Sequence, residues 1–83
     1  MLNKAIQKSI TTLDNLRVRL SEAETEGYGE KLVAKLEGQV DRGYERVADV
    51  AKRQGFTKLT GEEYDSATEI DVDTLNYELS LKL

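Results

Sequence analysis

Apolar residues recur every three or four positions through residues 2–25, a segment without glycine. Each residue of an α-helix turns by about 100°, so residues at this spacing fall on one side of a helix. The apolar set consists of Leu2, Ile6, Ile10, Leu13, Leu16, Leu20 and Ala23. The pattern therefore predicts a helix over residues 2–25, and the sequence Gly27-Tyr28-Gly29 predicts its C-terminal end and a turn.

A second periodic segment covers residues 30–54 and ends before Gly55. Its apolar or small positions alternate between spacings of three and four, which is the pattern of a helical packing seam. The seam residues are Val33, Leu36, Val40, Gly43, Val47 and Val50. Two helices of similar length joined by a short turn predict an antiparallel αα-hairpin over residues 1–55. Because such a hairpin is thin, we expect the seam either to pack the hairpin or to dock another chain.

Two glycines interrupt the second predicted helix, and each costs about 1 kcal/mol relative to alanine inside a helix. Gly43 stands on the seam, where a missing side chain lets another backbone approach. From the sequence, close packing and chance explain Gly43 equally well. Gly38 falls on the outer face, where we interpret it as a tolerated small residue or a mild bend.

The acidic C-terminal element, residues 56–83, has a different pattern. Thr60 and Glu63 have the spacing of a capping box, which predicts a short helix over residues 61–69. The sequence as a whole therefore predicts one small, mainly α domain in which this element follows the hairpin.

Residues 74–83 alternate between polar and apolar types, which favours a half-buried strand. Such a strand needs a partner, which would be residues 56–60 or another chain. A helix is the alternative for this segment, with Asp71 or Asp73 as its N-cap. The apolar residues at helical spacing are Val72, Leu75, Leu79 and Leu83.

The composition narrows the chemistry that this chain can perform. It has 83 residues, room for one domain, and contains neither Cys nor His. Zinc sites of the ordinary ligand types, a thiol nucleophile and an imidazole base are therefore excluded. The chain also lacks a glycine-rich phosphate loop, and paired carboxylates need an enclosing pocket to work as acid and base. We expect no enzymatic activity and no cofactor.

The pattern of apolar residues also bears on location. No apolar run approaches the about 20 residues that span a bilayer, and the N-terminus lacks the continuous apolar region of a signal peptide. We therefore expect a cytoplasmic protein that does not enter a membrane.

Charge is distributed unevenly along the chain, whose net charge is −4. Residues 1–60 carry 11 basic and 9 acidic side chains, whereas residues 61–83 carry 1 and 7. The candidate partner-binding acids are Glu62, Glu63, Asp65, Glu69, Asp71 and Asp73. A calcium loop starting at Asp71 would need an oxygen ligand and then glycine where the chain has Leu75 and Asn76, so no metal site is predicted.

The second predicted helix segregates its charges around its axis. Five basic residues fall within about one-sixth of a turn and form a basic stripe: Lys31, Lys35, Arg42, Arg46 and Arg53. Like charges four residues apart are mildly destabilising, so the helix is not optimised for itself alone. The stripe is interpreted as a solvated face, as the binding site of the acidic segment of the same chain, or as a surface for another molecule. Because the chain is acidic and has no nucleic-acid-binding motif, direct nucleic-acid binding is disfavoured.

These observations favour a small non-enzymatic protein–protein interaction factor. We expect an adaptor or inhibitor of a larger protein, of the kind frequent among bacterial and phage accessory proteins, acting as a homo-oligomer or in a hetero-complex. One alternative is an acidic inhibitor that mimics nucleic acid and occupies a nucleic-acid-binding protein. A second alternative is a structural subunit that adds residues 75–83 as a strand to a larger assembly.

Overall fold

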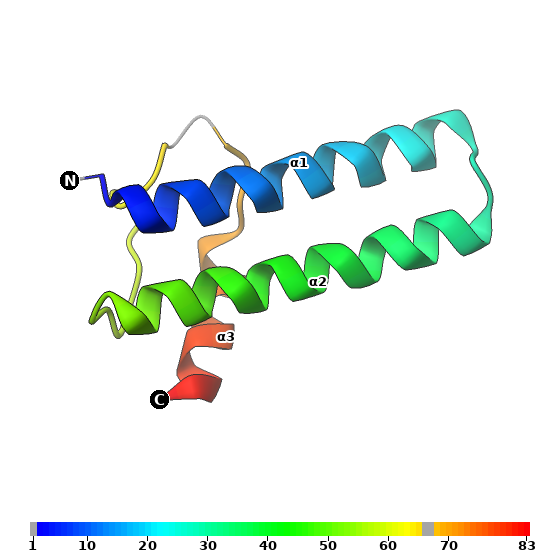
Figure 1. Ribbon diagram of the computed structural model, residues 1–83. Coiled ribbons are helices and arrows are strands. Elements are labelled where there is room, and N and C mark those ends of the chain that lie inside the picture. The colour runs from blue at the N-terminus through cyan, green and yellow to red at the C-terminus, as the bar shows by residue number, and fades with distance from the viewer. Residues whose placement is uncertain (1, 66–67) are drawn as a thin grey trace.

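The computed structural model describes residues 2–65 and 68–83. Within these residues the chain forms the helices α1 (Lys4–Glu26), α2 (Glu30–Arg53) and α3 (Val72–Lys82), and no strand. α1 and α2 run side by side in opposite directions, and α3 packs against α2 near the end of the hairpin where the chain begins (Figure 1). The predicted mainly α hairpin is confirmed.

Local signals set the ends of α1 and the turn into α2. The side chain of Asn3 caps α1 by accepting hydrogen bonds from the backbone N–H groups of Ala5 and Ile6, both at 3.1 Å. Gly27 ends α1 in the left-handed conformation with φ 70°, and Gly29 follows with φ 99°. Only glycine adopts these angles without strain, which explains why the turn contains two glycines.

Of the glycines in this chain, Gly43 has the least space around it, because α1 packs closely against α2 at this position. A Cβ atom at Gly43 would lie 2.8 Å from Cδ1 of Leu13, a side chain that is fully buried. At Gly38 the nearest atom to such a Cβ would be Nη1 of Arg42, at 3.5 Å. Close packing therefore accounts for Gly43, and Gly38 is a small residue on an open surface.

Residues 72–82 form α3, so the strand favoured for residues 74–83 is wrong and its helical alternative is right. Asp71 caps the helix: its Oδ1 accepts a hydrogen bond from the N–H of Asp73 at 3.0 Å. Leu75 and Leu79 point into the core, whereas Tyr77 and Leu81 point away from it and are exposed. Apolar residues on two opposite sides of a short helix produce an alternating sequence, which imitates a strand.

The helix predicted over residues 61–69 is also wrong for the described part of that range, since residues 61–65 and 68–69 contain no helical residue. The capping contacts nevertheless form: the carboxylate of Glu63 accepts from the N–H of Thr60 at 3.1 Å. They close a turn instead, because Gly61 has φ 98° and cannot begin a helix.

We call residues 54–71 the linker, and the side chain of Asn76 in α3 holds Leu59 of this linker. The amide of Asn76 accepts from the backbone N–H of Leu59 at 2.7 Å and donates to the carbonyl oxygen of Leu59 at 2.8 Å. This pair of bonds takes the place of the strand pairing expected between residues 56–60 and the C-terminal segment.

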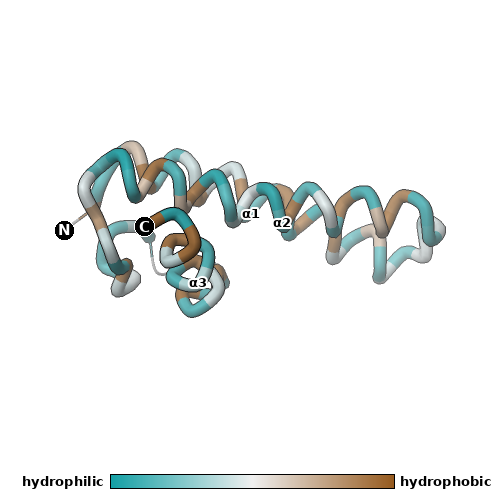
Figure 2. The backbone as a smooth tube through the Cα atoms, turned by 90° about the horizontal axis from the view of Figure 1, so that it is seen from below, coloured by the Kyte–Doolittle hydropathy of each residue, from teal (hydrophilic) through white to brown (hydrophobic). Residues whose placement is uncertain are grey.

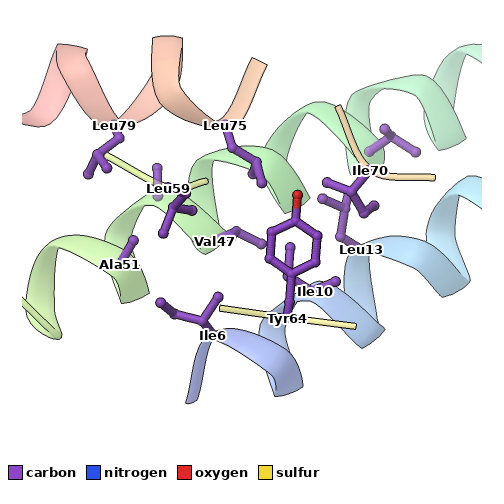
Figure 3. Packing of buried hydrophobic residues seen from close by; sticks show 12 residues of the cluster. Ile6, Ile10, Leu13, Val47, Ala51, Leu59, Tyr64, Ile70, Leu75 and Leu79 are labelled. Carbon is purple, nitrogen blue, oxygen red and sulfur yellow. The ribbon is translucent and has the colours of Figure 1, made fainter. Parts of the chain in front are cut away.

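The hydrophobic core draws on all three helices and on the linker (Figure 3). Figure 3 shows Leu75 and Leu79 pointing from α3 toward α2 and Leu59, with the ring of Tyr64 beside Ile10. The buried cluster comprises Ile6, Ile10, Leu13, Val40, Val47, Ala48, Ala51, Leu59, Tyr64, Ile70, Leu75 and Leu79. Leu36, Val40 and Val47 of the predicted seam are buried, and its other three members are half-buried. The seam therefore packs the hairpin itself.

Candidate interaction face

The linker and α3 lie on one side of the hairpin, as the edge-on view of Figure 2 shows. We call this side the covered face and the opposite side the open face. Hydrogen bonds fasten the linker to the covered face: the N–H of Asn3 donates to the carbonyl of Glu63 at 2.8 Å, and the N–H of Asp65 donates to Oε1 of Gln7 at 2.5 Å. Further along, the N–H of Asp71 donates to the hydroxyl of Tyr44 at 3.3 Å.

A groove of about 370 Å³ lies between α1 and α2 on the open face. Its lining residues are Ser9, Thr12, Leu13, Leu16 and Arg19 of α1, and Gln39, Arg42, Gly43 and Arg46 of α2. Gln39, Gly43 and Arg46 project from the side of α2 opposite to Tyr44 and Ala48, which contact the covered-face core. We call this the arginine groove. At the floor of this groove Leu13 packs against Gly43 and is itself fully buried.

A second groove of about 340 Å³ continues from the first toward the turn of the hairpin. It shares Arg19 and Gln39 with the arginine groove. Its other lining residues are Glu22, Ala23, Tyr28, Leu32, Lys35 and Leu36. Tyr28 and Leu32 are 57% and 41% exposed, so this end of the open face also offers apolar surface. The two grooves together run along most of the hairpin.

The open face is positively charged. Four cations line the two grooves, Arg19, Lys35, Arg42 and Arg46, and Glu22 is the acid that lines them. In the described part of the chain the ion pairs are Arg17–Asp14, Arg17–Glu69 and Lys82–Asp49, so none of the four cations has a carboxylate partner there. The face therefore carries positive charge that no ion pair within the described residues neutralises.

Three members of the predicted basic stripe line the grooves: Lys35, Arg42 and Arg46. Lys31 and Arg53 are exposed on the same helix. The sequence pattern missed Arg19, because Arg19 belongs to α1 and joins the stripe only through the way the two helices pack. The sequence does place Arg19 at the edge of the apolar side of α1, three residues after Leu16 and directly before Leu20. That position was the signal that could have identified it.

Of the predicted acidic residues, Glu63 is turned inward and is 8% exposed. Its carboxylate accepts hydrogen bonds from the N–H and the hydroxyl of Thr60 and from the N–H of Gly61, each at 3.1 Å. Burial alone would raise the pKa of Glu63, but these hydrogen bonds outweigh it and hold the pKa below its ordinary value. Glu63 thus holds the linker turn together and is not part of an exposed acidic surface.

The other predicted acids are exposed on the side of the linker and α3. Hydrogen bonds from the hydroxyl of Thr74 and the N–H of Asp73 lower the pKa of Asp71, the N-cap of α3. Oε2 of Glu69 lies 3.8 Å from Nη2 of Arg17 on α1. The ion pairs of the described residues do not join these acids to the basic stripe. Glu62, Asp65 and Asp73 complete the exposed acidic group.

The covered face has its own hollow beyond the linker, near the turn of the hairpin. This hollow of about 400 Å³ is lined in part by the acids Glu24, Glu30 and Glu37, together with Val33 and Ala23. The half of the hairpin nearest its turn therefore presents positive charge on the open face and negative charge on the opposite face. In the part of the chain that the structure describes, no helix is long and apolar enough to cross a bilayer, and no three acidic side chains form a metal site.

Comparison of the chain with protein-family models, with curated proteins and with solved structures gives no match.

Proposed function

We propose that this protein is a small non-enzymatic interaction factor that binds a larger protein through the open face of its hairpin, as an adaptor or an inhibitor. The observation that supports this most directly is the continuous groove whose cations have no ion-pair partner among the described residues. Segregating the charges costs α2 a few tenths of a kcal/mol for each like-charged pair four residues apart. A surface that destabilises its own helix is better explained by a partner than by solvent.

Contact between two open faces of this same chain does not explain the surface. A symmetric pairing would bring the cation-lined surface of one copy, with Arg19, Arg42 and Arg46, against the same surface of the other. Like charges in such contact disfavour association. We therefore propose a hetero-complex on this face, in place of the homo-oligomer that a free seam suggested.

The two alternative functions have less support. For an acidic mimic of nucleic acid, Glu63 would not be available to a partner, because its carboxylate is hydrogen-bonded to the linker backbone. The carboxylate of Asp71 is likewise hydrogen-bonded at the N-terminus of α3. The alternative of a structural subunit required residues 75–83 to form a strand, but residues 75–82 are helical and Leu83 follows directly.

The proposal is tested by charge reversal on the open face. We expect tagged wild-type protein, captured from the cells that produce it, to retain a protein partner that the variant R42E/R46E does not retain. The variant K4E/K58E makes the same change in net charge at two exposed lysines outside the two grooves, and should keep the partner. Equal retention by R42E/R46E and the wild-type protein, with helical content unchanged by circular dichroism, would contradict the proposal.

A further inference from the structure

We propose that the occupant of the open face is an acidic amphipathic α-helix of the partner protein, which completes a three-helix bundle with α1 and α2. This inference rests on the proposed function and adds the chemistry and the shape of the partner. It is built on the arginine groove, its continuation toward the turn, and the cations along both.

The shape of the open face fits a helix. The furrow between two antiparallel helices is the place where a third helix packs in a bundle. On the covered face α3 packs against α2 alone, with Leu75 and Leu79 fully buried, so no helix of the described chain occupies the furrow between α1 and α2. On the open face the linked grooves extend along α2 from Arg46 to Leu32. At 1.5 Å per residue this is about 20 Å, or about four turns of a docked helix.

The arrangement of side chains defines the chemistry of that helix. The half-buried Leu16 lines the arginine groove, and the exposed Tyr28 and Leu32 line its continuation, so an apolar stripe can be buried against these three side chains. Arg42 and Arg46 stand on the α2 side, and Arg19 stands on the α1 side. A helix with carboxylates on both flanks of an apolar stripe would meet a cation on either side. Arginine pairs with carboxylates in a bidentate geometry, which favours Asp and Glu at those flanks.

Nucleic acid fits the open face less well. A phosphate backbone is charged along its whole length and has no apolar stripe to bury against Leu16, Tyr28 and Leu32. The hairpin also carries Glu24, Glu30 and Glu37 on its reverse side, and the net charge of the chain is −4. Together these charges oppose a polyanion that extends beyond the groove.

The test uses a synthetic peptide of about four helical turns, with leucines at three- and four-residue spacing and glutamates on both flanks. A matched peptide carries lysine in place of every glutamate. Titrated into isotope-labelled protein at low salt, the acidic peptide should shift the amide signals of Thr12, Leu16, Gln39 and Gly43. We expect its affinity to fall about tenfold or more in R42E/R46E and to remain near the wild-type value in K4E/K58E. Affinity should also fall as salt is added, since exposed charges are screened.

The possible outcomes separate this inference from the proposed function. Equal binding of both peptides, shifts confined to the covered face, or no shift at millimolar peptide would overturn the acidic-helix inference. Tighter binding of a duplex DNA than of the acidic peptide at the same salt would instead assign the face to nucleic acid. If cells yield a partner that R42E/R46E loses while the acidic peptide fails to bind, the proposed function stands and this inference falls. If the peptide binds as expected but no cellular protein depends on Arg42 and Arg46, the proposed function falls.

Discussion

The covered and open faces of the hairpin are built from the same two helices but from different residues. On the covered face α2 presents Ala48 and Ala51, whose small side chains allow the linker and α3 to approach and form the core. On the open face α2 presents Gln39, Arg42 and Arg46 beside Gly43, and no element of the described chain covers them (Figure 2). The charge segregation of α2 therefore follows the architecture: basic residues lie where the described chain does not cover itself.

The largest expected effect on stability is the difference between substitutions on the buried and the exposed side of α3. Replacing the buried Leu75 with alanine should lower the free energy of unfolding by about 3 kcal/mol, because the substitution leaves a cavity in the core. The same change at Leu81, which is 64% exposed, should cost less than about 0.5 kcal/mol. Urea unfolding of the two variants measures both values. Equal losses would contradict the helical arrangement, since a half-buried strand would place both leucines on one face.

Removing the side chain that holds Leu59 of the linker against α3 should have the next largest effect. Asn76→Ala leaves the N–H and the carbonyl of Leu59 without their partner and should cost about 2 kcal/mol. Asn15→Ala, at an exposed position of α1, serves as the control and should change stability by less than about 0.5 kcal/mol. Both values come from urea unfolding, and a similar small cost for Asn76→Ala would show that this contact does not fasten the linker.

Glu63 should make the covered face sensitive to acid. Its pKa is lowered in the folded protein, so its stabilising contribution is complete above the unfolded pKa of about 4.3. That contribution is lost as the pH falls through the lower folded-state pKa, because the unfolded state then binds more protons. Glu63→Gln should cost about 1–2 kcal/mol at pH 7 and show a shallower loss of stability below pH 5.

Unfolding free energies measured between pH 7 and pH 3 give this comparison directly. The neighbouring exposed residue provides the control, and Glu62→Gln should leave both the stability and its pH profile close to those of the wild-type protein. A profile of Glu63→Gln that runs parallel to that of the wild-type protein would contradict the role given to Glu63.

The smallest expected change in stability comes from replacing each of the two glycines of α2 with alanine. Gly38→Ala should stabilise the protein by up to about 1 kcal/mol, because alanine favours the helix and the added methyl group would make only an ordinary contact with Arg42. Gly43→Ala should instead cost about 1 kcal/mol, since its Cβ would force the buried Leu13 to move. Thermal unfolding of the two variants decides this, and a gain at both positions would show that the hairpin is not tightly packed at Gly43.

The hairpin could be predicted closely from the sequence, whereas the C-terminal element could not. Residues 2–25 and 30–54 carry an unmixed helical period bounded by glycines, and the observed helices differ from these limits by two residues or fewer. The end of the chain misled the prediction because leucines occupy two opposite sides of α3. The linker residues Leu59, Tyr64 and Ile70 enter the core from irregular chain, which has no period to reveal them.

The candidate site was also only partly predictable. Lys35, Arg42 and Arg46 share one side of one helix, so helical geometry alone groups them. Arg19 joins them through the relative rotation of α1 and α2, which the pattern of a single helix does not contain. The inward position of Glu63 depends on the turn at Gly61, a conformation that the capping-box spacing does not reveal.

Site-specific photo-crosslinking in the producing cells tests whether a partner binds the open face and not the acidic covered side. One variant carries the photoreactive residue at Gln39, which lines both grooves, and the other carries it at the exposed Glu62 of the linker. We predict a crosslinked protein from position 39 and none from position 62. Crosslinking from position 62 without crosslinking from position 39 would contradict the account.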